Sequence, residues 1–297
     1  MTAETPQLTD AELALVRMAI AEDLPDGDAT SEAIVPADLA ARAAIVAREP
    51  AVVAGLAAAV AVAREVDPRV RARAERSDGT PLGDGALVAA GERVLAFDGP
   101  ARGILAAERT ALNFLGRLSG VATLTRAFVD AVAGTGVRIL DTRKTTPGWR
   151  SLEKAAVRAG GGENHRMNAS EMLLVKDNHR ALLGGVRGCI DRLGARTRTD
   201  RDGRPLPLEI EADDLTDVCS LIDAGAGRIL LDNMDLAALR RAVAAIRGSG
   251  RAIAIEASGG VRLDTVRAIA ETGVDAISIG AITKDARWID FSLEILA

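Results

Sequence analysis

Six short apolar runs between Gly136 and Ala281 limit more than any other feature what this chain can fold into. Segments of helical composition, such as Leu236–Ile246 and Leu263–Ala270, separate the later runs. Short apolar strands that alternate with helices predict parallel βαβ units. Six units are fewer than the eight of a complete barrel, so we expect an incomplete or open parallel α/β barrel. The predicted strands are Val137–Asp141, Leu173–Asp177, Leu208–Glu211, Arg228–Asp232, Ala252–Glu256 and Asp275–Gly280.

The residues before these runs have a different sequence pattern. Thr9 and Glu12 fit a capping box ahead of apolar residues at helical spacing, so a first helix should run to about Glu22. Short alternating stretches between residues 40 and 103, divided by Asp-Gly and Gly-Asp pairs, predict a small sheet with one helix at about residues 55–66.

A longer helical segment, Ala106–Ala133, leads toward the barrel, and we expect an interruption near Ser119–Gly120. The change from short alternating stretches to regularly spaced apolar runs predicts two domains. We place a smaller N-terminal α/β domain at residues 1–116 and the barrel at residues 117–282, with residues 283–297 returning to the smaller domain.

Composition and charge exclude several classes of protein. The chain has 297 residues, of which 48% are apolar, enough for a barrel with a smaller companion domain. Aromatic residues are scarce at 2%, Tyr is absent and the net charge is −5, so nucleic-acid binding is not expected. The longest apolar run, Ala51–Ala63, is shorter than the about 20 residues of a membrane span.

The first residues are polar and lack the layout of a signal peptide, so a cytoplasmic protein is expected. Cys189 and Cys219 show no metal-ligand spacing and fit two buried thiols in a reducing compartment.

Rare residue types gather between Asp141 and His179. The chain has 37 Lys plus Arg, yet only four are Lys, and three of these, as well as both histidines, lie in this stretch. A compact ammonium and a titratable imidazole can act where a guanidinium cannot, so the stretch predicts a site for a polyanion. The residues are Lys144, Lys154, Lys176, His165 and His179, with Lys284 as the remaining Lys.

Carboxylates follow two of the predicted strands. Glu209 and Glu211 lie on one face of a strand, because side chains alternate with period two. Asp232 ends the next strand, so Glu211 and Asp232 could share a magnesium ion with a substrate phosphate. The alternative is that these acids form ion pairs with the abundant Arg.

Cations and glycines also lie near the ends of the predicted strands, which together form one face of a parallel barrel. Cations near strand ends suit an anionic ligand, although each alone could be a solvated charge; they are Arg109, Arg143, Lys144, Arg166 and Lys176. Ser258–Gly260 and Gly280–Ala281 follow the last two strands, where barrels often bind phosphate, although tight turns would explain them too. His179 is expected to be structural.

Several of these motifs together resemble the quinolinate phosphoribosyltransferase family. The resemblance runs from about residue 10 to the C-terminus, and the central motif is highly specific. It rests mainly on Leu140–Gly148, Gly160–Arg166, Val175–His179, Leu231–Asn233, Glu256–Gly260 and Thr272–Ala281. It implies an N-terminal α/β sandwich, an open α/β barrel of six or seven strands, and a homodimer whose sites each use an arginine of the partner.

The resemblance also implies a reaction and a role for each matching residue. Quinolinate and phosphoribosyl pyrophosphate would react with Mg²⁺ present, giving nicotinate mononucleotide, pyrophosphate and carbon dioxide. Arg143, His165 and Arg166, with Arg109 of the other subunit, would hold the quinolinate carboxylates. Lys144 and Lys176 would serve the sugar pyrophosphate and the ring, and Glu211 and Asp232 the metal and ribose. Phosphate would be held by Ser258, Gly259, Gly260, Gly280 and Ala281.

Three departures from the family pattern concern the acceptor. Met167–Ser170 stands where the family usually has Gly-Leu, Ala155 stands where an aromatic residue is common, and Thr283–Asp285 replaces Thr-His-Ser. Lys284 keeps a cation for phosphate there. A paralogue that uses another planar carboxylated acceptor, and a non-catalytic barrel that binds a phosphate ligand, remain as alternatives.

Overall fold

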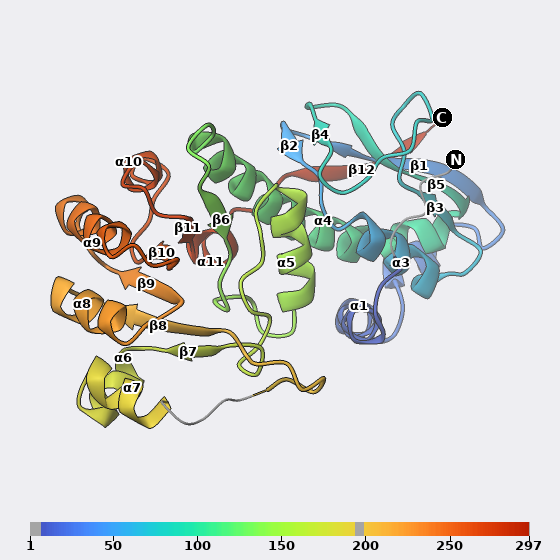
Figure 1. Cartoon of the computed structure of the whole chain (residues 1–297). Helices are drawn as coiled ribbons and strands as arrows, with labels where there is room; N and C mark the ends of the chain where they lie inside the picture. The colour runs from blue at the N-terminus through green and yellow to red at the C-terminus, as the bar shows by residue number, and fades with distance from the viewer. Residues whose placement is uncertain (1–6, 194–198, 297) are drawn as a thin grey trace. The chain divides into compact units, whose positions relative to one another are not determined.

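The computed structural model describes residues 7–193 and 199–296, which divide into two compact units (Figure 1). The first unit contains the residues up to Arg126, residues Thr145–Gly161 and the residues from Ile282 onward. The second contains Ala127–Lys144 and Gly162–Ala281. These ranges differ from the predicted 1–116 and 117–282, because a segment that follows the first barrel strand belongs to the first unit.

A four-stranded antiparallel sheet forms the centre of the first unit, in the order β12-β1-β5-β3. Apolar side chains such as Ile45 and Leu95 are fully buried there. The last strand of the chain pairs with β1, from Arg42 opposite Leu296 to Ala47 opposite Phe291. The strands are β1 (Ala40–Ala47), β3 (Arg71–Arg73), β5 (Arg93–Pro100) and β12 (Phe291–Leu296), with a separate pair of β2 (Ala51–Val52) and β4 (Leu87–Val88).

Helices α1, α2, α3 and α5 belong to the first unit, and α4 begins there and ends in the second unit. The predicted capping box is confirmed, because the Thr9 side chain accepts from the Glu12 backbone and the Glu12 side chain accepts from the Thr9 backbone. The predicted helix near 55–66 is confirmed as α3. The helices are α1 (Asp10–Asp23), α2 (Ala29–Ile34), α3 (Leu56–Val66), α4 (Ala101–Ala131) and α5 (Arg150–Ala159).

The predicted interruption near Ser119–Gly120 is wrong, since α4 runs without a break for 31 residues. The small residues mark close contacts instead of a break. The Ser119 hydroxyl accepts from the Ala54 amide at 3.0 Å. A Cβ at Gly120 would lie 1.9 Å from the Arg287 carbonyl oxygen, so only glycine lets the chain pass this closely.

A six-stranded parallel sheet forms the second unit, in the order β6-β11-β10-β9-β8-β7. All six predicted strands and the open parallel α/β architecture are confirmed, with β6 and β7 at the two edges. Its strands are β6 (Arg138–Leu140), β7 (Leu173–Val175), β8 (Leu208–Ala212), β9 (Arg228–Asp232), β10 (Ala254–Ser258) and β11 (Ala276–Ser278). Its helices are α6 (Asp177–Leu183), α7 (Val186–Leu193), α8 (Leu215–Asp223), α9 (Leu236–Gly248) and α10 (Val266–Ala270), and the short α11 (Ala281–Lys284) begins at its last residue.

Two further predictions, on the cysteines and on membrane-spanning segments, can be compared with the structure. Cys189 is buried, but the prediction that both thiols are buried is wrong, because Cys219 on α8 is exposed. Among the described residues, no helix combines the length and the apolar character needed to cross a membrane.

The segment that follows Lys144 is anchored inside the first unit by a buried ion pair. Glu153 on α5 is fully buried, and its Oε1 accepts from Arg117 Nη2 at 2.6 Å and from Nε at 3.0 Å. Thr146 donates its hydroxyl to the same carboxylate at 2.8 Å and its backbone N–H at 3.1 Å. Trp149 stacks on Phe114 with ring centroids 4.6 Å apart. These contacts fix the backbone from Thr146 to the start of α5.

Candidate active site

Most of the predicted site residues follow the carboxyl ends of strands in the second unit. The carboxyl ends of parallel strands meet at one edge of a sheet, so these side chains are brought to the same edge. Arg109 and Lys284 belong instead to the first unit. Lys284 is exposed, and its Nζ lies 3.0 Å from an Oδ2 of its neighbour Asp285. The residues of the second unit are Arg143, Lys144, His165, Arg166, Lys176, Glu211, Asp232, Ser258, Gly259, Gly260, Gly280 and Ala281.

Glu211 lies beside Lys176, which follows the neighbouring strand. Glu211 is 4% exposed, and its Oε2 is 3.1 Å from Lys176 Nζ. Its Oε1 accepts the backbone N–H of Asp177 at 3.0 Å. Both oxygens of Glu211 therefore have a partner, and the ion pair is with Lys rather than with Arg.

Asp232 lies at a tight corner between two loops. Its carboxylate accepts from the Ser258 hydroxyl and from the Asn233 side-chain amide. Gly259 has a φ of +94°, and a Cβ there would lie 2.2 Å from Asn233 Oδ1. Gly260 also has a positive φ, of +58°, but its missing Cβ faces open space. Gly259 is therefore required by packing, whereas Gly260 leaves the backbone accessible for a ligand.

Lys144 and Gly280 meet across adjacent strands. β6 and β11 pair in parallel, and a Cβ at Gly280 would lie 3.1 Å from Lys144 Cδ. The Lys144 backbone N–H donates to Thr142 Oγ1 at 3.0 Å, which fixes the turn after β6. The glycine thus leaves room for the Lys144 side chain at this edge.

Two guanidinium groups lie close enough to influence each other. Arg166 donates through Nη1 to the Met172 carbonyl at 3.0 Å. Burial lowers the pKa of Arg166, and the positive charge of Arg143 lowers it further, while Glu209 and Glu171 act in the opposite direction. Two neighbouring cations repel each other unless an anion neutralises them, so this pair favours a carboxylate or a dicarboxylate.

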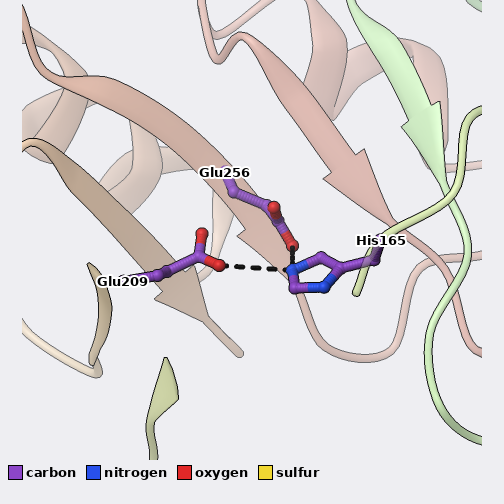
Figure 2. A group of neighbouring side chains, drawn as sticks. All are labelled: His165, Glu209 and Glu256. Atoms are coloured by element: carbon purple, nitrogen blue, oxygen red, sulfur yellow. Dashed lines mark hydrogen bonds and ion pairs between the residues drawn. The ribbon is translucent and has the colours of Figure 1, made fainter. Parts of the chain in front are cut away.

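His165 lies between two buried carboxylates (Figure 2). Its Nε2 is 3.2 Å from Glu209 Oε2 and 3.6 Å from Glu256 Oε1. Its Nδ1 accepts the backbone N–H of Arg166 at 2.8 Å. The side chain of His165 is 8% exposed, and those of Glu209 and Glu256 are 0% and 3% exposed. Burial and the nearby charge of Glu209 raise the pKa of Glu256 to about 7, although His165 opposes this shift.

The sequence analysis gave Glu209 and Glu256 no role in the site. The available signal was spacing, since Glu209 is two residues before Glu211, and Glu256 is two before Ser258. Side chains two apart on a strand share a face, so these acids form a deeper layer below the strand ends. Nothing in the sequence pattern identifies His165 as the common neighbour of the two acids, because it lies on a loop that is distant from both in the sequence.

His179 contacts the backbone of its own turn. Its Nδ1 accepts the N–H of Lys176 at 3.1 Å, at the start of α6. This contact is consistent with the structural role that the sequence predicts for His179.

Comparisons with known proteins identify the family. Residues 28–119 match the family described as quinolinate phosphoribosyl transferase, N-terminal domain, and residues 121–294 match its C-terminal domain. The chain belongs to the quinolinate phosphoribosyl transferase family. The predicted family resemblance is therefore confirmed over most of the chain.

Relatives of known name and structure cover the whole length. A carboxylating nicotinate-nucleotide pyrophosphorylase of Mycobacterium leprae is 40% identical over 292 residues, covering 96% of this chain and 98% of the relative. A probable enzyme of the same name from Methanothermobacter thermautotrophicus is 38% identical over 285 residues, covering 95% and 98%. The solved nicotinate-nucleotide pyrophosphorylase of Francisella tularensis has a TM-score of 0.86 at 34% identity, covering 99% and 100%.

One departure from the family pattern is a closed turn in the structure. The backbone N–H of Met167 donates to Glu171 Oε2 at 2.6 Å, and the Asn168 amide donates to Glu171 Oε1 at 2.9 Å. The Ser170 backbone N–H donates to Asn168 Oδ1 at 2.8 Å. Asn168 thus stabilises the loop between Arg166 and β7, and it is exposed.

Proposed function

We propose that this member of the family transfers the phosphoribosyl group of phosphoribosyl pyrophosphate to quinolinate, with release of pyrophosphate and carbon dioxide and formation of nicotinate mononucleotide. The observation that carries the proposal is the positive charge of Arg143 near the partly buried Arg166: burial lowers the pKa of Arg166, and Arg143 lowers it further. Quinolinate has two carboxylates, which are the groups that neighbouring guanidiniums bind best. Relatives that cover the whole chain are named for the carboxylating enzyme.

The proposed chemistry assigns binding and charge to a few side chains. The bond between ribose C1 and the pyrophosphate oxygen breaks, and a bond between C1 and the ring nitrogen forms. Glu211 and Asp232 stabilise the positive charge on the ribose, and Lys144 and Lys176 bind the leaving pyrophosphate and the reacting ring. When the adjacent carboxylate departs as carbon dioxide, its bonding electron pair stays on the ring carbon, where the positively charged ring nitrogen stabilises it, and a proton from solvent then binds to that carbon. No covalent intermediate with the protein is required.

Mg²⁺ is the proposed cofactor, and Glu211 and Asp232 would hold it together with the substrate. Carboxylate oxygens suit this cation, which is usually held by one or two carboxylates and by substrate phosphates. In the structure these oxygens contact Lys176, Asp177, Asn233 and Ser258, so the cation would replace part of these contacts. When bound, it supplies neutralisation of the negative charge on the pyrophosphate. The proposed phosphate contacts are those of Ser258, Gly259, Gly260, Gly280 and Ala281, all in the second unit.

A homodimer with shared sites and a cytoplasmic location also belong to this proposal. Arg109 would reach the acceptor carboxylates of the other subunit, beside Arg143, Arg166 and His165. A third guanidinium suits a substrate with two carboxylates and a pyrophosphate, since the combined negative charge is large.

An acceptor other than quinolinate is the second candidate. The exposed turn at Asn168–Ala169 and the ion pair of Lys284 with Asp285 stand where the family pattern differs. A planar acceptor with one carboxylate would compensate the charges of two neighbouring guanidiniums less fully than a diacid, which favours the diacid. A barrel that only binds its ligand would not need the contact of Lys176 with Glu211.

A turnover assay separates these possibilities. Purified protein receives phosphoribosyl pyrophosphate, Mg²⁺ and either quinolinate or nicotinate, and product and carbon dioxide are measured. We expect nicotinate mononucleotide from quinolinate alone, and no product from either acid would refute the proposal. Arg166→Ala should remove turnover of quinolinate. Arg187→Ala is the matched control, because its guanidinium is 77% exposed and forms only a surface pair with Asp191.

A further inference from the structure

We propose that Glu209 and Glu256 are positioning residues: they orient the His165 ring, and the ring in turn fixes the backbone of Arg166 at the acceptor site. The inference rests on the proposed function, because it assigns Arg166 to an acceptor carboxylate. It gives His165 a role through its neighbour in place of the direct substrate contact that the family resemblance implies.

The tautomer of His165 follows from its neighbours. The backbone N–H of Arg166 points at Nδ1 at 2.8 Å, so Nδ1 must carry a lone pair and not a hydrogen. The ring hydrogen therefore lies on Nε2, where the carboxylate of Glu209 accepts it at 3.2 Å. Both ring nitrogens are thus engaged within the protein, which leaves neither of them directed at a ligand.

The same geometry argues against a metal at this cluster. One ligand atom from each of His165, Glu209 and Glu256 lies within 4.8 Å of the others, which is a spacing that a metal ion could use. A neutral imidazole that binds a metal through Nε2 carries its hydrogen on Nδ1. That hydrogen would face the N–H of Arg166, so two donors would oppose each other. The cluster therefore holds protons rather than a metal.

The two acids have different roles. Glu209 accepts the N–H of His165 through Oε2. Glu256 is 3% exposed, its Oε1 lies 3.6 Å from His165 Nε2, and the Ser278 side chain lies beside it. Burial makes this carboxyl group keep its proton more strongly than a carboxyl group in water. Glu256 thus closes the space beside the ring in a way that an amide can imitate.

The ring acts together with Asp141 to support the loop that carries Arg166. The fully buried Asp141 accepts the backbone N–H of His165 at 2.8 Å and the side-chain amide of Asn164 at 2.6 Å. The Nδ1 atom of His165 then holds the next N–H, that of Arg166. Removing this support frees the Arg166 backbone, and its guanidinium loses its fixed direction toward the acceptor.

Two variants of His165 separate a positioning role from direct contact. His165→Asn keeps an acceptor at the position of Nδ1, whereas His165→Gln keeps only a donor at the position of Nε2. We expect the KM for quinolinate to rise about tenfold in His165→Gln, the effect of one lost hydrogen bond, and to change less in His165→Asn. The KM for phosphoribosyl pyrophosphate should stay within about twofold in both. The reverse order of the two variants would refute the proposal.

Further variants keep the test decisive if a His165 variant folds poorly. Glu256→Gln should change the KM for quinolinate less than Glu209→Gln. The matched control is Glu163→Gln, because its exposed side chain forms a surface pair with Arg138 at 3.3 Å. In an Arg166→Ala background, His165→Gln should raise the dissociation constant for quinolinate, measured by direct binding, little further, since the ring acts through Arg166. Equal effects of the two buried acids, with one equivalent of metal in the purified protein, would contradict the positioning role. A wild type that does not turn over quinolinate would refute the proposed function instead.

Discussion

Replacing the buried Glu153 should destabilise the first unit more than any surface ion pair can. Its carboxylate has no exposed surface and accepts four hydrogen bonds, two from Arg117 and two from Thr146. Glu153→Gln removes the charge and leaves the guanidinium of Arg117, whose side chain is 12% exposed, without its counter-ion. Breaking a buried pair in this way costs about 3–5 kcal/mol of unfolding free energy.

Urea unfolding followed by circular dichroism measures this loss. The matched control is Glu271→Gln, because its pair with Arg267 is an i,i+4 pair on the surface with the Glu271 side chain 55% exposed. That change should cost about 0.3–0.5 kcal/mol. Replacing both buried partners by apolar residues, Arg117→Met with Glu153→Leu, should recover part of the stability, since no charge is then left buried. A loss below about 1 kcal/mol in Glu153→Gln would show that the carboxylate is not the buried support described above.

Three further predictions concern the second unit and the assembly. The pKa of Glu256 is raised from 4.5 to about 7, so the folded protein holds a proton that the unfolded chain releases near pH 4.5. The unfolding free energy should therefore fall as pH rises from about 4.5 to 7, by up to about 3 kcal/mol, and Glu256→Gln should flatten this slope in urea titrations at several pH values. Gly259→Ala should lower the melting temperature by several degrees, because the new Cβ would lie 2.2 Å from Asn233 Oδ1, and an unchanged value would contradict the packing described for that corner. Arg109→Ala and Arg143→Ala should each abolish turnover, and mixing the two inactive proteins should restore part of it through mixed dimers; no restoration would count against shared sites.

The barrel strands could be predicted from the sequence because each is a short apolar run buried within a parallel sheet. Strands such as β9, predicted and observed at Arg228–Asp232, carry this pattern without any help from distant residues. Chemistry at their carboxyl ends follows from topology alone, since parallel strands end at one edge. For the same reason Lys176 and Glu211, on neighbouring strands, could be expected to meet.

The two wrong predictions, the helix interruption and the burial of Cys219, have a common physical cause. Each depends on a neighbour that is remote in the sequence. Ser119–Gly120 was expected to interrupt a helix, yet these residues leave room for Ala54 and the Arg287 carbonyl. A local pattern cannot distinguish a helix break from a close crossing, as both favour small residues. The exposure of Cys219 depends in the same way on which face of α8 packs inward.

The acids of the second unit form two layers, and the layers explain how an acidic protein can present a cationic site. Glu211 and Asp232 lie at the strand ends, where Lys176 and Ser258 contact them. Glu209 and Glu256 lie one step deeper and face His165. Burial and the charge of Arg143 lower the pKa of Arg166, whereas Glu209 raises it, so the deeper layer reduces the cost of holding two guanidiniums together before any substrate binds. Neutralising Glu209 should thus weaken the site in two ways, by loosening the His165 ring and by leaving the repulsion between the arginines less compensated.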